Sequence, residues 1–363
     1  MQRVIRQPVL IVARGLDPVG TGRQVELVVR GLAALGVDVH LALASGGGSL
    51  GRRLAAAGVP VHDVGRRPAP DAAAVTRLAG LARRLAPAAV IAFGGRQAAA
   101  LAAARPLVPR TVAVACLATP LRGRLVGWAV RGCDRVVATS EGIASSCRRA
   151  GVAADRILVV PPGIEADPGS GLSRRELGDR LGLDVAKHWT LCVAPLETAS
   201  RLERLLWGID QLGVVRRDVE HVLVGEGPRL GMLERRAQIQ RLSERLVVLP
   251  HCDVIGDLLA HVRLVWQSGC VALGGALLDG MARGVPAVAV DGDAARQIVA
   301  DGETGRIVKP EPESDLARRA FGIVEDDALA ARYAAAAATR ARDSFPPGPL
   351  VEAFERLLQT AAD

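Results

Sequence analysis

The sequence predicts an α/β protein built from two doubly wound parallel-sheet domains. Apolar strand-like runs alternate with helix-like segments along the whole chain, which favours parallel sheets covered by helices on both faces. The alternation stops at 167–188, a connector with proline, glycine and charged residues, and then starts again. At 363 residues, the chain is long enough for two domains with full cores.

The first domain is predicted to span residues 1–166. It opens with a strand over 8–13, a loop, a helix over 24–35 and a strand over 37–44. Apolar residues recur at helical spacing along that helix, and Gly36 ends the pattern. The further elements predicted in this half are strands at 59–64, 88–93 and 111–116, a helix at 71–85, and an alanine-rich helix after Gly94-Gly95.

The second domain is predicted to span residues 167–345, and a last helix at 350–358 lies in the remaining segment 346–363. A strand beginning at Thr190 opens this domain. The strand beginning at His221 ends in Gly-Glu-Gly-Pro and leads into a helix, where Pro228 suits the first turn because no N–H is needed there. The other predicted elements are strands at 246–250, 262–267 and 287–290, and a helix containing Leu277, Leu278 and Met281.

Composition indicates a globular protein, since half of the residues are apolar and 23% are charged. Six scattered cysteines without a Cys-x-x-Cys pair are typical of free thiols in a reducing compartment, so we expect a cytoplasmic location. The six histidines form no metal-ligand cluster, and we expect no bound metal. There is no apolar run of membrane-spanning length, and no signal peptide is expected at the start.

The positive charge is concentrated in the first half. Residues 1–165 contain 22 arginines and nine acidic residues, a net charge of +13, whereas the remainder carries −5. A basic half suits an anionic membrane surface or an acidic acceptor, so peripheral contact with the inner membrane face is one interpretation of this charge. A coding bias towards arginine and alanine explains the charge as well. With one tyrosine and four phenylalanines, base stacking is hard to build, so we expect no nucleic-acid partner.

A glycine-rich loop at 46–51 satisfies the pattern Gly-x-Gly-x-x-Gly of dinucleotide-binding domains. It follows the second predicted strand rather than the first. No acidic residue ends the next strand at the expected distance, because Asp63 comes about a dozen residues later. A nicotinamide-dependent dehydrogenase is therefore a weak alternative.

The most informative stretch is 262–305, which is predicted to fold as strand, glycine-bearing turn, helix and strand. It contains Ser268, then Met-Ala-Arg-Gly-Val-Pro at 281–286, then Asp-Gly-Glu-Thr-Gly at 301–305. In this order the pieces resemble the donor-site region of the GT-B glycosyltransferases, specifically the retaining family 4. The resemblance covers about the whole chain and implies two Rossmann-like domains facing a cleft, with the segment 346–363 crossing back to the first domain.

The resemblance also assigns roles to positions. The two carboxylates of the Glu-x7-Glu pair fall at Val271 and Asp279, so one is lost and the other is shortened. The Arg/Lys pair that neutralises the leaving diphosphate falls at Pro195 and Ser200, which carry no charge. Arg201 is adjacent and is a candidate substitute.

Nucleotide-sugar binding is expected, by the same resemblance, at the glycine turns of both domains and at the base-contact position. Backbone N–H groups at such turns suit an anion, and absent side chains allow close approach. The expected binding residues are Gly20, Gly225, Glu226, Gly227, His251, Gly274, Gly275 and Asp279.

By resemblance, the predicted function is retaining, metal-independent transfer of a hexosyl group from a UDP-, GDP- or ADP-sugar, with no cofactor. The acceptor is expected to be a glycan or a lipid-linked molecule. The alternative is a catalytically weakened pseudo-glycosyltransferase that binds a nucleotide, a glycan or a partner enzyme, since removing a single transition-state donor costs about 10²–10³ in rate.

Overall fold

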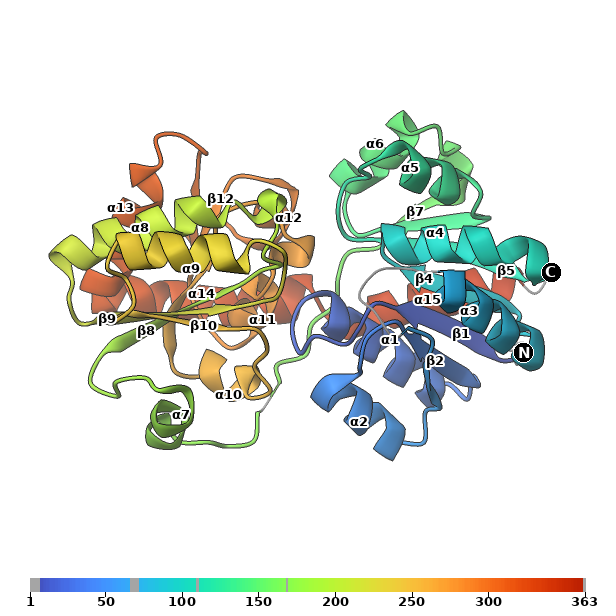
Figure 1. Cartoon of the computed structure of the whole chain (residues 1–363), viewed down its shortest axis with the longest axis horizontal. Helices are drawn as coiled ribbons and strands as arrows, with labels where there is room; N and C mark the ends of the chain where they lie inside the picture. The colour runs from blue at the N-terminus through green and yellow to red at the C-terminus, as the bar shows by residue number, and fades with distance from the viewer. Residues whose placement is uncertain (1–6, 66–71, 109–110, 168, 362–363) are drawn as a thin grey trace. The chain divides into compact units, whose positions relative to one another are not determined.

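The computed structural model describes residues 7–65, 72–108, 111–167 and 169–361, which form two compact units (Figure 1). Unit 1 comprises residues 1–163 and 346–363, and unit 2 comprises residues 164–345. Each unit contains one parallel sheet with helices packed on it. The predicted α/β class with two Rossmann-like parallel-sheet domains is confirmed.

The sheet of unit 1 has seven strands in the order β3-β2-β1-β4-β5-β6-β7, and every pair is parallel. Its strands are β1 (Val9–Ala13), β2 (Val39–Leu43), β3 (Val61–Asp63), β4 (Ala89–Phe93), β5 (Val112–Leu117), β6 (Arg135–Ala138) and β7 (Ile157–Val159). Its helices are α1 (Thr21–Ala34), α2 (Gly48–Ala56), α3 (Ala72–Leu85), α4 (Gly95–Ala104), α5 (Arg124–Arg131), α6 (Glu141–Arg149) and α15 (Pro347–Ala361).

The sheet of unit 2 has six parallel strands in the order β10-β9-β8-β11-β12-β13. Its strands are β8 (His188–Val193), β9 (Val219–Val224), β10 (Leu246–Leu249), β11 (Val262–Gln267), β12 (Ala287–Val290) and β13 (Gly305–Val308). Its helices are α7 (Arg174–Leu181), α8 (Leu202–Val215), α9 (Leu230–Ile239), α10 (Ile255–Leu259), α11 (Leu277–Ala282), α12 (Asp293–Ile298), α13 (Ser314–Glu325) and α14 (Asp327–Ser344).

Strand alternation divides the core of unit 1 into two layers. Val9 and Ile11 of β1 pack in the layer that holds α1, α2 and α15. Leu10 and Val12 point to the other face, where they pack with residues of α3, α4, α5 and α6. Successive side chains of a strand point to opposite faces, so a strand covered on both sides reads as one continuous apolar run. This is why β1 could be predicted from its sequence.

The connector between the domains contains a helix that we did not predict. Ser173 accepts a hydrogen bond from Glu176 N while the Glu176 carboxylate accepts one from Ser173 N, and Gly182 ends α7 in the left-handed region at φ 71°. The spacing Ser-x-x-Glu is the sequence signature of such a capping box. The stretch before it is fixed by the buried Asp257, whose Oδ1 accepts from the N–H groups of residues 170, 171 and 172.

The chain passes between the units twice, and the two crossings are adjacent. In unit 2, Ile164 N donates to Phe345 O at 2.7 Å. In unit 1, a Cβ added to Gly163 would lie 2.9 Å from the Cα of Pro347. The side chain of Gln24 on α1 fixes Gly163, because its Nε2 donates to Gly163 O at 2.7 Å and its Oε1 accepts from Gly163 N at 2.9 Å.

Candidate functional site

The strand order of unit 2 reverses between β8 and β11, so the connections that follow these two strands leave the sheet in opposite directions. Open α/β sheets bind ligands outside the carboxyl ends of their strands at such a point. The loop 194–201 follows β8, and the loop 268–276 follows β11. We call these two loops together the carboxyl edge of unit 2. Most of the residues assigned to catalysis from sequence lie on it.

The two loops are joined by hydrogen bonds. Cys270 N donates to Ala199 O at 2.9 Å, and Ser268 Oγ donates to Ser200 O at 2.8 Å. A Cβ added to Gly269 would lie 2.5 Å from Ala199 O, so only glycine permits this approach. The carboxyl edge is therefore a connected platform rather than two independent loops.

The positions aligned with the Arg/Lys pair are both neutral, and the structure shows how they are used. Pro195 is exposed, and the hydroxyl of the buried Ser200 donates to Pro195 O at 2.6 Å. The serine side chain thus stabilises the loop 194–201 by a hydrogen bond within it. Arg201 is exposed and adopts φ 49°, a left-handed conformation, at the residue that precedes α8.

A second arginine, Arg204 in the first turn of α8, reaches the carboxyl edge. Its Nη1 donates to Ser268 O at 3.2 Å, and its Nε lies 3.9 Å from Glu313 Oε1. The side chain is 15% exposed, and Nε makes no hydrogen bond. Its guanidinium is held at the end of β11 by the bond to Ser268 O, and its buried Nε is a donor without a hydrogen bond. Sequence spacing alone gave no reason to rank it above Arg201.

Val271 is 7% exposed and packs in the hydrophobic core of unit 2 with Cys192, Ala194 and Leu196. The backbone then makes a tight turn in which Leu273, Gly274 and Gly275 all have positive φ. A Cβ added to Gly275 would lie 2.0 Å from Val193 O. The turn therefore brings its backbone directly against the end of β8, which gives Gly275 a structural role within the protein.

Asp279, the second position of the carboxylate pair, is 6% exposed and lies in the first turn of α11. A carboxylate in a first turn interacts favourably with the helix dipole. Val271 and Asp279 therefore lie before and after the glycine turn, the first as a core side chain and the second as a buried acid.

The Gly-Glu-Gly loop after β9 packs on the loop after β8. Leu196 N donates to Glu226 O at 2.9 Å. A Cβ added to Gly225 would lie 1.9 Å from Ala194 O, and one added to Gly227 would lie 2.5 Å from Leu196 O. The side chain of Glu226 is exposed. These glycines permit close contact between protein backbones, in addition to the ligand approach expected from sequence.

His251, at the expected base-contact position after β10, is exposed and its Nε2 lies 2.8 Å from Asp253 Oδ1. In unit 1, Gly20 is buried and precedes α1 with φ 60°. It lies beyond the end of β1, which is where the strand order of the first sheet reverses.

Comparison with known proteins assigns the two halves to glycosyltransferases. The family model described as Glycosyltransferase Family 4 matches residues 18–168, and the one described as Glycosyl transferases group 1 matches residues 187–326. The chain belongs to glycosyltransferase family 4. Both domains of this glycosyltransferase chain are thereby accounted for, and the resemblance inferred from the motifs is confirmed.

One curated relative of this family 4 chain is the phosphatidyl-myo-inositol mannosyltransferase of Mycolicibacterium smegmatis, which is 35% identical over 127 residues. That match covers 34% of this chain and only 32% of the relative. Two solved structures share the fold over nearly the whole chain. HepE of Anabaena in complex with UDP-glucose has a TM-score of 0.82 at 18% identity, covering 98% of this chain and all of that one. The sucrose-phosphate synthase of Thermosynechococcus elongatus has a TM-score of 0.78 at 15% identity, covering 99% and 100%.

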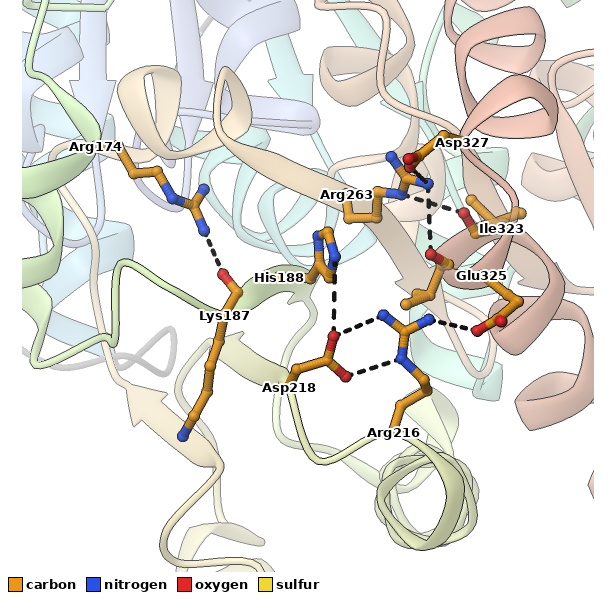
Figure 2. A network of polar contacts seen from close by, with 10 residues as sticks. Arg174, Lys187, His188, Arg216, Asp218, Arg263, Ile323, Glu325 and Asp327 are labelled. Atoms are coloured by element: carbon orange, nitrogen blue, oxygen red, sulfur yellow. Dashed lines mark hydrogen bonds and ion pairs between the residues drawn. The ribbon is translucent and has the colours of Figure 1, made fainter.

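A cavity of about 490 Å³ lies at the opposite end of the unit 2 strands of this glycosyltransferase, where β8 and β11 begin. Its lining includes Arg174, Lys187, His188, His261 and Arg263. Figure 2 shows that arginines here point to carbonyl and carboxylate oxygens of neighbouring segments. Arg174 Nε donates to Val185 O, for example, and Nη1 donates to His261 O. The basic residues thus stabilise the fold at the end of these strands opposite the carboxyl edge.

The same network fixes the ends of α13 and α14 (Figure 2). Arg216 donates to Asp218 at 2.6 and 2.8 Å and to Glu325 at 2.5 Å, and Arg263 Nη2 donates to Asp327 at 2.6 Å. The bonds from Arg216 lower the pKa of Asp218 to about 2. Burial, ahead of the charge of Arg263, lowers the pKa of His188, which keeps its imidazole neutral at pH 7.

Among the residues that the structure describes, no group of three or more His, Cys, Asp or Glu side chains is arranged to hold a metal ion. Five cysteines are buried and Cys270 is exposed on the carboxyl edge. Burial raises the pKa of Cys116 and Cys192 to about 12, so these thiols are protonated at neutral pH. No helix within the described ranges has the length and hydropathy needed to cross a bilayer.

Proposed function

We propose that the chain transfers a hexosyl group from a nucleoside-diphosphate sugar to a glycan or lipid-linked acceptor, with retention of configuration and without a bound metal. The observation that carries this proposal is the carboxyl edge of unit 2. There, in a family 4 glycosyltransferase, two loops at a strand reversal are joined into one platform beside Arg204. The donor binds there, in the region where open α/β sheets place their ligands.

In this proposal the glycine turns at 225–227 and 274–275 let the diphosphate approach the backbone, His251 lies near the base, and Asp279 hydrogen-bonds the ribose. Gly20 supplies the corresponding backbone turn in unit 1. HepE was crystallised with UDP-glucose, which supports a uridine donor ahead of guanosine and adenosine donors. No cofactor takes part.

The leaving diphosphate gains negative charge in the transition state, and preorganised cations and backbone N–H groups stabilise it. Pro195 and Ser200 supply no cation, so the active site is divergent at both positions. Arg204 supplies the charge in their place, because its guanidinium is held at the end of β11 with one donor unused. Arg201, exposed at the start of α8, is the second candidate.

A specific observation favours the alternative of a binding-only protein. Val271, aligned with the carboxylate at the sugar, packs in the core and cannot accept a hydrogen bond from a hydroxyl group. A site that keeps its backbone turns and loses this carboxylate holds a nucleotide better than it cleaves a glycosidic bond. In that case the chain is a pseudo-glycosyltransferase that binds a nucleotide, a glycan or a partner enzyme.

The curated relatives support a lipid-linked acceptor. The mycobacterial proteins are named as mannosyltransferases of phosphatidyl-myo-inositol, a lipid. Their matches span less than half of each relative, so a lipid-linked acceptor is proposed here as a class and not as that molecule. It fits the basic character of the first half and a cytoplasmic protein that contacts the inner membrane face.

The deciding experiment is NMR of the full chain with a panel of UDP-, GDP- and ADP-sugars, followed for line broadening and for hydrolysis over hours. Selective broadening with slow loss of one donor supports the transferase. Broadening without loss, also in the presence of lipid and glycan acceptors, supports the binding-only alternative. No broadening with any nucleotide overturns the transferase and the nucleotide-binding form of the alternative, and leaves a glycan or a partner enzyme as the ligand.

The role of Arg204 is tested in the same assay with Arg204→Gln and with Arg236→Gln, an exposed arginine on α9, as the matched control. We expect Arg204→Gln to lower turnover by about 10²–10³, the usual cost of removing one stabilising donor. The control keeps the turnover of the unchanged protein. Equal turnover in both variants assigns the charge to another residue.

A further inference from the structure

Helix α5 of unit 1 presents two large apolar side chains to solvent. Leu125 is 80% exposed and Trp128 is 61% exposed. The other three tryptophans, at 189, 207 and 266, are buried or half-buried. Residues three apart lie on one face of a helix, so the two side chains form a single apolar strip. Tryptophan buries a large area when it finds a partner, so an exposed one on a helix needs an explanation.

The opposite face of α5 is firmly packed, so the exposure does not come from a loosely held helix. Ala129 and Val130 are fully buried, and Val130 belongs to the core layer under α3 and α4. A Cβ added to Gly95 would lie 2.6 Å from Val126 Cγ1, which shows how closely α5 lies on the start of α4. The fold therefore holds Leu125 and Trp128 outward (α5 is labelled in Figure 1).

The segment that contains the strip carries one sign of charge. Between Asp71 and Asp134 the sequence has nine arginines, no lysine and no acidic residue. This span supplies α3, α4 and α5, which are neighbours on one face of the first sheet. Arg122 and Arg124, beside the strip, are exposed. Within the described part of the chain they have no hydrogen-bond or ion-pair partner, in contrast to the paired arginines of Figure 2.

Single exposed apolar residues are common on protein surfaces and carry no meaning by themselves. Unit 2 offers such a case, since Ile239 on α9 is 82% exposed. The segment around it holds both Glu234 and Glu244 as well as arginines. The strip on α5 differs because an aromatic and an aliphatic side chain share a face, on a segment whose charged residues are all arginines.

We propose that α5 is a membrane-docking helix for anionic lipid. It lies in the plane of the bilayer surface with Leu125 and Trp128 inserted at the depth of the headgroups, and Arg122, Arg124 and Arg131 contact lipid phosphates. Apolar insertion and attraction to anionic headgroups together give binding of this kind, and tryptophan is enriched at this depth. This inference deepens the proposed membrane contact and does not depend on turnover at the donor site.

The test is flotation of the full chain with vesicles of pure phosphatidylcholine and with vesicles in which about 30% of the lipid is the anionic phosphatidylglycerol. We expect binding to the anionic vesicles only, weakened by high salt. Leu125→Ser/Trp128→Ser should abolish it, and Arg122→Gln/Arg124→Gln should weaken it about fivefold for each arginine, corresponding to ~1 kcal/mol per residue. The matched control is Ile239→Ser, which should bind like the unchanged protein.

A second readout locates the insertion. Lipids with brominated acyl chains should quench the fluorescence of Trp128, and Trp128→Phe should remove that quenching while the protein still floats with the vesicles. Equal binding to neutral and anionic vesicles, or full binding by Leu125→Ser/Trp128→Ser, overturns the proposal. So does no vesicle binding together with a dimer that Leu125→Ser/Trp128→Ser dissociates, because the strip then contacts a second copy of the chain.

Because the vesicle assay contains no sugar nucleotide, its result is separate from that of the donor panel. A protein that binds vesicles and no nucleotide retains this inference and loses the proposed function. A protein that turns over a donor and ignores anionic vesicles does the opposite.

Discussion

The two units have the same strand order, since β3-β2-β1-β4-β5-β6 and β10-β9-β8-β11-β12-β13 are equivalent, yet individual arginines in them are used in different ways. Arginines such as Arg216 and Arg263 in unit 2 are bonded to carbonyl and carboxylate oxygens and hold helices to strands. In unit 1, Arg105 is bonded to Asp134 in the same way, whereas Arg122 and Arg124 make no hydrogen bond or ion pair within the described residues. The strand order therefore determines where the candidate sites lie. The pairing of charges distinguishes arginines that stabilise the fold from arginines that are available to a partner.

If the carboxyl edge of unit 2 is a platform that also forms part of the core, changes there should damage folding most. We predict that Val271→Glu destabilises unit 2 by roughly 3–5 kcal/mol, because it buries a charge without a partner. Chemical denaturation followed by circular dichroism measures this, with Val271→Ile as the conservative control. A Val271→Glu protein as stable as the unchanged chain would mean that the side chain at this position reaches an open site. A carboxylate there could then take part in catalysis.

A smaller loss is expected from Gly275→Ala. The added Cβ would lie 2.0 Å from Val193 O at a residue with φ 64°, so strain and overpacking should cost about 1–3 kcal/mol. The matched control is Gly231→Ala on α9, where nothing lies within 4 Å of the added atom. That change should be neutral or stabilise by up to about 1 kcal/mol. The difference between their denaturation midpoints is the measurement, and equal midpoints would contradict the tight turn.

The third prediction concerns pH and unit 2 alone. Burial, ahead of the charge of Arg245, lowers the pKa of His221 from 6.5 to about 3. Below pH 6.5 the unfolded chain takes up a proton that the folded chain refuses, so stability is complete above this pH and falls towards pH 3. The slope approaches about 1.4 kcal/mol per pH unit.

His221→Gln should flatten that acid limb, although it costs stability at pH 7 through the Thr190 contact of 2.7 Å. Denaturation midpoints between pH 7 and pH 4 provide the comparison. An acid limb as steep as that of the unchanged protein would assign the proton uptake to other groups.

The smallest effect is expected in unit 1. Leu125→Ser and Trp128→Ser remove side chains that face solvent, so each should change the free energy of unfolding by no more than about 0.5 kcal/mol. Thermal unfolding without lipid checks this. A large loss would show that the strip packs on the protein, and the contrast between the two units would then disappear.

The fold was predictable from sequence because strands covered on both faces read as continuous apolar runs, and amphipathic helices show apolar residues at helical spacing. Val262–Gln267 and the helix containing Leu277, Leu278 and Met281 were expected and are present as β11 and α11. The helix α7 was missed although Ser173 and Glu176 carried the signal of its capping box. We interpreted the connector from its overall composition, and a capping box, which depends on two positions only, is not visible in a composition.

The loops that form the candidate site were predictable in position, whereas the contacts of their side chains were not. Spacing placed Val271 and Ser200 on loops at the strand reversal, but it could not show that one side chain enters the core and the other bonds Pro195 O. Side-chain direction in a loop depends on which backbone it packs against, and that partner is distant in sequence. Arg204 shows the same limit, since its link to the site runs through a contact with Ser268, which lies on another strand's loop.

The bond between Ile164 and Phe345 means that unit 2 is an insertion whose two ends meet. A domain with adjacent termini can be removed or permuted with little disturbance of its own packing. Residues 164–345 are therefore suited to expression as a separate protein. A short linker from Gly163 to Pro346 would join the two segments of unit 1 and keep α15 attached. Each half of the molecule can thus be prepared and titrated by itself, donor nucleotides with one and vesicles with the other.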